Sequence, residues 1–130
     1  MSTHPNVTVV DEMTQAIFGH DRDKLATLFT EDLAFHVRGA LPINGDYHGV
    51  DGLLSALGKM FELTGGNIKL DQLFCVGTGD WAAEWEQAAL TVDGRTLEIN
   101  NGFIYRFEGA RIAEMWFLSA APAESVSFWS

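Results

Sequence analysis

Five polar side chains in the 130-residue sequence could together carry proton-transfer chemistry: His36, Glu84, Glu86, Asn101 and Tyr105. The imidazole of His36, whose ordinary pKa is about 6.5, can take a proton from carbon or water near neutral pH. Tyr105 and Asn101 can donate hydrogen bonds to a carbonyl oxygen, and Glu84 or Glu86 can orient His36 or shuttle a proton. These residue types indicate general acid–base catalysis.

The sequence gives less indication of a metal site, a cofactor site or a catalytic nucleophile than of acid–base catalysis. His36 and His48 lack a third ligand at a suitable spacing, so we expect no metal. Cys75 lies between Phe74 and Val76 and is interpreted as a structural thiol in a strand. There is no glycine-rich phosphate loop and no Ser-His-Asp pattern, and we therefore expect no cofactor.

Composition and charge limit the class of protein further. The chain is 47% hydrophobic and 20% charged, which is typical of a globular protein, and its length suits a single domain over residues 1–130. Its formal net charge of −10 would repel phosphate backbones and anionic lipid, so no nucleic acid and no membrane are expected as partners. The start has no signal-peptide pattern and no window is apolar enough to span a bilayer, which favours a cytoplasmic protein.

Helices are expected in the first half of the chain, at three places. Apolar spacing predicts one over residues 5–18, which Gly19 can close in a left-handed conformation. Asp21 can cap a short second helix, and a third is predicted over 50–64, ending at Gly65-Gly66. The extended run 33–37 lies between them, and residues 38–49, rich in Gly with Pro42 and Asn44, are expected to form a loop.

The second half of the chain is predicted to be an antiparallel meander. Strands are expected over 68–76, 81–92, 96–107 and 111–118, separated by glycine-containing turns. Helices first and a meander afterwards favour an α+β fold in which the helices cover one face of the sheet.

The dipeptide Asp93-Gly94 predicts a two-residue hairpin and therefore a strand register. If Val92 pairs with Arg95, Glu86 lies opposite Asn101; a shift of one residue would exchange the two faces. One face then carries Glu84, Glu86, Ala88, Leu90, Leu97, Ile99, Asn101, Phe103 and Tyr105, and the other carries Ala83, Trp85, Gln87, Asn100, Gly102 and Ile104.

These two faces lead to two expectations. Burying Glu84 and Glu86 would be costly without partners or a ligand cavity, so they either border a cavity or lie at a solvent-facing sheet surface. The opposite face, with Trp85 and Ile104, is expected to form a homodimer.

The run from Leu28 to Gly39, followed by Gly45-Asp46-Tyr47-His48-Gly49, resembles the nuclear-transport-factor-2-like superfamily, and more narrowly its SnoaL-like and ketosteroid-isomerase-like proteins. The later run from Tyr105 to Trp116 and the ending Phe128-Trp129 are similar to the same group. The resemblance implies a strongly curved, mostly antiparallel (mixed) sheet wrapped by three N-terminal helices around an apolar pocket. It also implies pocket-lining roles for Phe35, Glu86, Phe103, Met115, Phe117, Met13 and Phe61.

The resemblance also places the functional residues of these enzymes on this chain. Ketosteroid isomerases use an aspartate base with a tyrosine and a protonated aspartate as oxyanion donors. The tyrosine falls at Met13 and the donor aspartate at Phe103, while the base falls at either Val37 or His36. The aspartate of SnoaL-like cyclases falls at Phe117.

Two functions therefore stay open at the level of sequence. The first is a cofactor-free acid–base enzyme of isomerase, cyclase or dehydratase type, acting on a small hydrophobic carbonyl compound, with His36 lining the pocket as the principal base. The alternative is a non-catalytic module that binds a small ligand or serves as a dimeric interaction domain.

Overall fold

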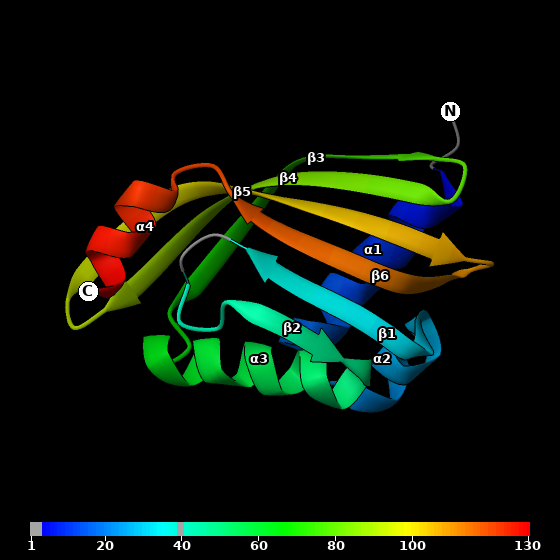
Figure 1. The fold of residues 1–130 in the computed structure, drawn as a ribbon, viewed down its shortest axis with the longest axis horizontal. Helices are drawn as coiled ribbons and strands as arrows, with labels where there is room; N and C mark the ends of the chain where they lie inside the picture. Colours follow the sequence, from blue (N-terminus) through cyan, green and yellow to red (C-terminus); the bar gives the residue numbers. More distant parts are fainter. Residues whose placement is uncertain (1–3, 39–40) are drawn as a thin grey trace.

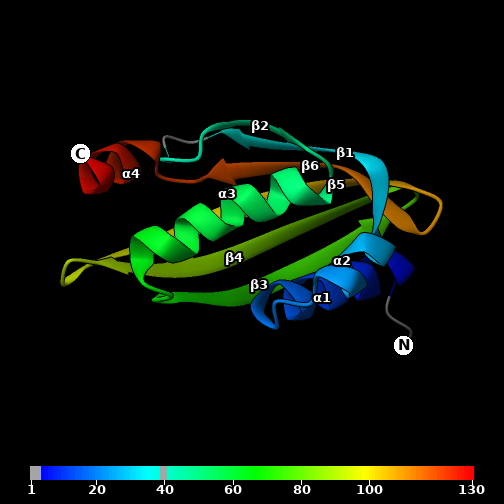
Figure 2. The same ribbon diagram turned by 90° about the horizontal axis from the view of Figure 1, so that it is seen from below.

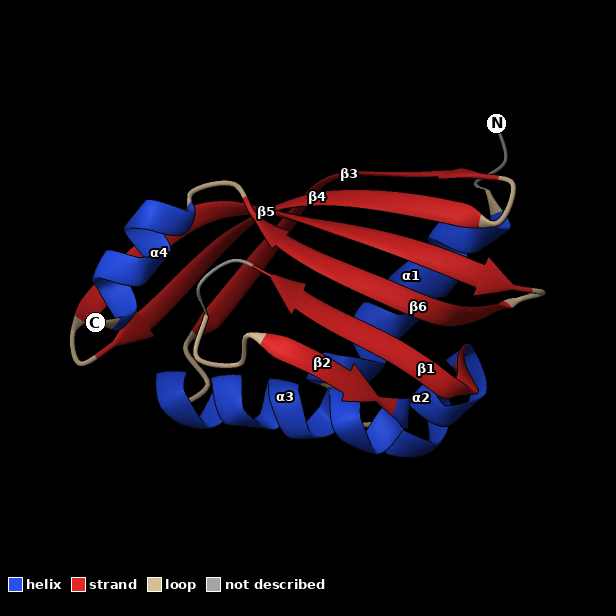
Figure 3. Ribbon diagram, viewed as in Figure 1, coloured by secondary structure: helices blue, strands red, loops and turns tan. Residues whose placement is uncertain are grey.

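A six-stranded, curved, mixed sheet forms the framework of the computed structural model, which describes residues 4–38 and 41–130. The spatial order is β2-β1-β6-β5-β4-β3, and all neighbours are antiparallel except the parallel pair β1 and β6 (Figures 1 and 3). The strands are β1 (Phe29–Arg38), β2 (Gly45–His48), β3 (Ile68–Thr78), β4 (Trp81–Val92), β5 (Arg95–Glu108) and β6 (Arg111–Ser119).

Four helices accompany the sheet: α1 (Pro5–Phe18), α2 (Arg22–Leu28), α3 (Gly49–Thr64) and α4 (Pro122–Trp129). Figure 2 shows α3 and the α1–α2 pair lying on the same side of the sheet. We define the inner face of the sheet as the one that packs against these helices and the outer face as the opposite one. The predicted α+β fold with three N-terminal helices is confirmed, and α4 is an addition that the sequence analysis did not predict.

The ends of the helices follow local chemistry. Asp21 caps α2 as expected, because its carboxylate accepts the backbone N–H of Lys24 at 3.1 Å. Gly65 ends α3 in a left-handed conformation with φ 59°. The same expectation for Gly19 is wrong: it keeps φ −83°, and the left-handed residue is its neighbour His20, with φ 54°.

The hairpin between β4 and β5 has the predicted turn and register. Asp93 and Gly94 have φ values of 52° and 77°, as a type I′ turn requires. Val92 pairs with Arg95, and Glu86 lies opposite Asn101. Both carboxylates of β4 consequently face inward, toward the helices.

Two elements differ from the expected secondary structure. The segment expected to be a loop contains β2, which pairs antiparallel to β1 with Tyr47 opposite Phe35; Gly39, part of the same segment, lies outside the described residues. The unpredicted α4 packs Phe128 against Ala88, Leu97 and Ile99. The guanidinium of Arg95 lies 5.1 Å from the centre of the Phe128 ring, a cation–π contact that helps to hold α4 at this end of the sheet.

The core joins the helices to the inner face of the sheet. Val10 of α1, Leu25 of α2 and Leu53 of α3 are fully buried, as are Leu33 and Val37 of β1.

Across the described ranges, no helix has the length and apolar character needed to cross a membrane.

Candidate functional site

A cavity of about 130 Å³ lies between the inner face of the sheet and helices α1 and α3. Its lining is mostly apolar and comes from residues far apart in the sequence. Every predicted site residue except His36 lines it: Met13, Phe35, Phe61, Glu84, Glu86, Asn101, Phe103, Tyr105, Met115 and Phe117. The structure thus brings these ten side chains together, while their roles in binding or catalysis stay predictions.

Phe103 and Phe117, where the family resemblance would place carboxylates, form part of the cavity wall. Their ring centres lie 5.1 Å apart in an edge-to-face arrangement. Phe103 also stacks on Tyr105 at 5.9 Å. Aromatic surface therefore replaces polar groups on this side of the cavity.

Glu84 is buried, and each of its carboxylate oxygens accepts a hydrogen bond. It is 6% exposed, and its two carboxylate oxygens accept the Tyr105 hydroxyl and the Gln72 amide N–H, each at 2.7 Å. Burial and the neighbouring Glu84 raise the pKa of Tyr105 well above its ordinary value, so the phenol stays a donor. Because that donor is used on Glu84, Tyr105 positions the carboxylate and does not offer its hydroxyl to the cavity.

Glu86 lies beside this pair with fewer partners. It is also 6% exposed, and the Asn101 side chain opposite it in the register is its hydrogen-bond partner. Burial, reinforced by the negative charge of Glu84, raises the pKa of Glu86 to about 7, and the bond from Asn101 offsets only part of this effect. The expectation of a cavity position is confirmed for both glutamates, and the solvent-facing alternative is wrong. Glu86 can consequently exchange a proton near neutral pH.

Cys75 of β3 also lies near this group and keeps its proton. Burial, together with the charges of Glu84 and Asp11, raises the pKa of its thiol to about 12. A thiol with this pKa is a poor nucleophile, which agrees with its structural interpretation.

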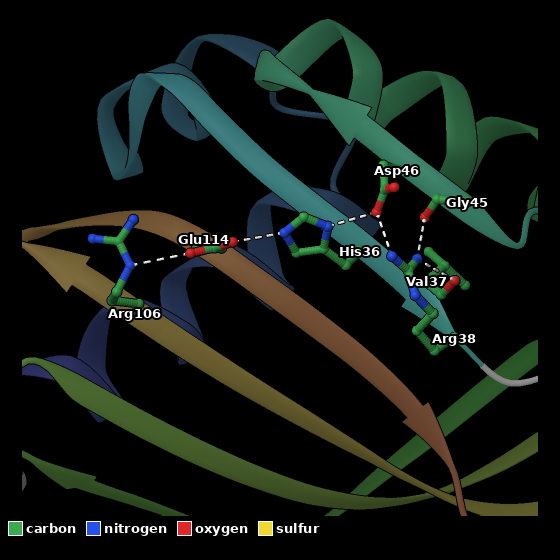
Figure 4. A network of polar contacts seen from close by, with 7 residues as sticks. All are labelled: His36, Val37, Arg38, Gly45, Asp46, Arg106 and Glu114. Carbon is green, nitrogen blue, oxygen red and sulfur yellow. Dashed lines mark hydrogen bonds and ion pairs between the residues drawn. The ribbon is translucent and has the colours of Figure 1, made fainter.

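His36 does not line the cavity, and the expectation that it does is wrong. Phe35 and Val37 of β1 point inward, so the pleat of the strand directs His36 to the outer face. There its two ring nitrogens lie 2.6 Å from Asp46 Oδ1 and 2.7 Å from Glu114 Oε2 (Figure 4). The Asp46 hydrogen bond and, to a lesser extent, Glu114 raise the pKa of His36, which favours the doubly protonated ring between two carboxylates.

The His36 network extends along the outer face through two arginines. Arg38 Nη2 contacts Asp46 Oδ1 at 2.8 Å, and Arg106 Nε donates to Glu114 Oε1 at 3.2 Å (Figure 4). The hydrogen bonds from His36 lower the pKa of both Asp46 and Glu114. With every charge paired, this network is suited to holding β2, β1, β6 and β5 together.

The rest of the outer face is rich in exposed aromatic and aliphatic side chains. Trp81 stacks on Trp116 with ring centres 6.1 Å apart, and both belong to this face. Trp85 lies across Gly102, where an added Cβ would come within 3.3 Å of the indole ring. The exposed members are Phe74, Val76, Trp81 and Leu118, with exposed fractions of 44–55%.

Sequence reasoning missed two polar residues near the cavity, Asp11 of α1 and Gln72 of β3. Gln72 lies opposite Glu86 in the strand register, but a bulge between Gln72 and Phe74 breaks the alternation that could have placed it. Asp11 precedes Met13 on α1 and gave no distinguishing pattern.

Within residues 4–38 and 41–130, no group of three or more His, Cys, Asp or Glu side chains is arranged to hold a metal ion.

The curved sheet, the three covering helices and the cavity between them define a nuclear-transport-factor-2-like cone. A model of the SnoaL-like domain family matches residues 10–115, and the chain belongs to that family. No curated protein matches the chain.

Solved structures share the fold at low sequence identity. A protein of unknown function with a cystatin-like fold from Xanthomonas campestris is 24% identical, with a TM-score of 0.82 and coverage of 96% of this chain and 98% of that one. Bal32a, from a soil-derived mobile gene cassette, is 21% identical with a TM-score of 0.87 and 97% coverage of both chains. TerC, co-crystallised with polyporic acid, is 15% identical with a TM-score of 0.81, covering 95% of this chain and 99% of TerC.

Proposed function

We propose that this protein is a cofactor-free acid–base enzyme, of isomerase, cyclase or dehydratase type, that acts on a small hydrophobic carbonyl compound in the cavity. The observation that supports it is Glu86, a buried carboxyl group whose pKa of about 7 suits proton transfer at neutral pH. It borders a mostly apolar cavity that could hold the body of a small hydrophobic substrate.

Three side chains have distinct roles in this proposal. Ionised Glu86 removes a proton from the carbon next to the substrate carbonyl and returns it to a second position. Asn101 has two amide N–H groups, so it can hold Glu86 with one and polarise the substrate carbonyl with the other. Burial raises the pKa of Glu86, and the charge of Glu84, which Tyr105 and Gln72 hold in place, adds to this effect.

The size of the cavity limits the substrate. An engineered apolar cavity of about 150 Å³ binds benzene, so a cavity of about 130 Å³ suits a body of roughly one ring. Cyclohexanone is therefore a suitable first probe. When cyclohexanone is incubated with the protein in D₂O, exchange of its α-protons for deuterium measures proton removal directly.

We expect the protein to accelerate deuterium uptake by cyclohexanone, measured by proton NMR. Because Glu86 must be ionised to act as a base, the rate should rise with pH through about 7 and become constant above it. A rate no faster than that of buffer, combined with saturable binding of cyclohexanone, would instead support the ligand-binding module.

That alternative keeps one specific observation in its favour. The Tyr105 hydroxyl, one of the two donors predicted for a substrate carbonyl, instead donates to Glu84. A binding module needs no oxyanion donor, whereas the enzyme must rely on Asn101.

We also propose that the protein is a homodimer assembled through the outer face of the sheet. Its exposed aromatic and aliphatic side chains form the kind of surface that marks protein interfaces, and Trp residues often dominate interface energetics. Trp85→Glu would place a charge in this interface. We therefore expect the dimer dissociation constant of the variant to be at least about 30-fold higher than that of the wild type. Sedimentation velocity at micromolar protein measures the change.

The matched control for the dimer is Leu63→Glu, which alters an exposed leucine of α3 on the other side of the sheet. This variant should sediment like the wild type. A wild-type protein that sediments as a monomer at micromolar concentration would contradict the proposed assembly.

A further inference from the structure

A second hollow, of about 240 Å³, opens between α1 and β3 and adjoins the apolar cavity. It shares Thr14, Leu70, Glu84 and Glu86 with the cavity lining, so the two spaces meet at the carboxyl pair. Its other lining residues are Asp11, Gln15 and Gln72, all polar. We call this space the polar hollow.

The polar hollow is lined by several hydrogen-bond acceptors. Most of the donors nearby already make hydrogen bonds within the protein. Gln72 Nε2 donates to Glu84 Oε2 at 2.7 Å and to Asp11 Oδ1 at 3.2 Å, which accounts for both amide hydrogens. The Thr14 hydroxyl donates to the Val10 carbonyl at 3.2 Å. Among the described lining residues, this leaves Gln15, exposed at the rim, and the protonated form of Glu86 as the remaining side-chain donors.

Glu86 gives a second, independent indication of a ligand. The residue is only 6% exposed, and it borders both spaces. Among the described residues, its hydrogen-bond partner is the Asn101 side chain, although an ionised carboxyl group has about four acceptor positions. A buried acceptor of this kind is stabilised by a donor that arrives from outside.

The charges around the polar hollow disfavour an anionic ligand. Three carboxyl groups line the polar hollow, and no described Lys or Arg lines either space. The whole chain carries a formal net charge of −10. An anionic group is therefore repelled here, whereas a hydroxyl or ammonium group finds acceptors.

We propose that the polar hollow is a subsite for a hydroxyl or ammonium group of the substrate, whose apolar body occupies the adjoining cavity. The substrate class is thus a small carbonyl compound of about one ring bearing a hydrogen-bond donor, and carboxylate-bearing or phosphate-bearing analogues are excluded. This inference rests on the proposed function, because it extends the same site.

Four probes of similar size test the subsite by isothermal titration calorimetry at neutral pH: toluene, benzyl alcohol, benzylamine and benzoate. Toluene should occupy the cavity alone. Benzyl alcohol and the cationic benzylamine should bind about tenfold tighter than toluene, as one good hydrogen bond to a charged group provides, and benzoate more weakly than toluene.

The variant Asp11→Asn removes one charge from the polar hollow while keeping its shape. It should reduce the preference for benzylamine over benzoate at least about threefold and leave toluene affinity unchanged. Glu12→Gln is the matched control, since Glu12 is the next residue of α1, contacts Lys24 at 3.7 Å and does not line the hollow.

The outcomes separate this inference from the proposed function. Toluene binding with equal affinities for benzylamine and benzoate would overturn the subsite and leave the cavity intact. A benzylamine preference that Asp11→Asn does not change would also overturn it. If none of the four probes binds, the cavity itself holds no ligand, and the proposed function fails with the subsite.

Discussion

Replacing Glu86 with glutamine is expected to lower the rate of proton exchange by about 10²–10⁴-fold, the contribution typical of a positioned general base. The amide has nearly the same shape as the carboxyl group but cannot accept the proton. Its neighbours Asn101 and Glu84 stay in place, so substrate affinity should change little. Deuterium uptake into cyclohexanone, with rates measured over a range of substrate concentrations, separates the rate from the affinity.

Two further variants sharpen this result. Glu98→Gln changes an exposed glutamate on the outer face of β5 and should keep the wild-type rate. Burial is the main cause of the raised pKa of Glu86, and Glu84→Gln removes the charge that adds to it, so the rise in rate should move to somewhat lower pH. A Glu86→Gln variant as active as the wild type would remove this residue from the mechanism.

The same Glu86→Gln substitution is expected to stabilise the fold above pH 7. The pKa of Glu86 is about 7 in the folded protein and 4.5 as its ordinary value, so between these values the folded state binds more protons than the unfolded state. Stability therefore falls as pH rises through this window, and the loss is complete above pH 7. A shift of this size corresponds to about 3 kcal/mol, an upper limit for the gain from glutamine.

Urea denaturation at pH 5 and pH 8 measures this effect as the difference in free energy of unfolding between variant and wild type. The gain should be large at pH 8 and should mostly disappear at pH 5, where Glu86 of the folded wild type is protonated. Glu98→Gln serves again as the control, with no pH-dependent gain. An equal gain at both pH values would show that the charge of Glu86 is not its origin.

The central hairpin was predictable because its determinants are local. Asp93 and Gly94 tolerate positive φ, and a two-residue turn leaves one register for the strands that flank it. That register was enough to place Glu84, Glu86 and Asn101 on the inner face.

His36 shows where the sequence argument failed although the signal was present. Phe35 and His36 were both assigned to the pocket, but adjacent residues of a strand point to opposite faces. The alternation of Leu33, Phe35 and Val37 identifies the inward set, and His36 falls outside it. The family resemblance, with the base at either Val37 or His36, outweighed the two-residue period.

Other features of the site depend on contacts between distant segments and could not be predicted. Gln72 reaches both Glu84 of β4 and Asp11 of α1 across a bulge, a geometry that no local pattern encodes. The raised pKa of Glu86 follows from how deeply it is buried beside Glu84. Similarly, β2 is four residues long and is stabilised by its pairing with β1, so its own sequence gave little indication of a strand.

The parallel pairing of β1 with β6 determines the order in which this chain can fold. β1 and β2 join the meander β3–β4–β5 only through β6, which comes last of the six strands in the sequence. Closing so large a loop makes folding slow compared with proteins built from local contacts. Until β6 is synthesised, the edge of β1 that pairs with β6 has no partner and is open to intermolecular pairing. During synthesis, no strand joins β1 and β2 to β3–β4–β5 before β6 is available, so protection of this edge of β1 depends on the last strand.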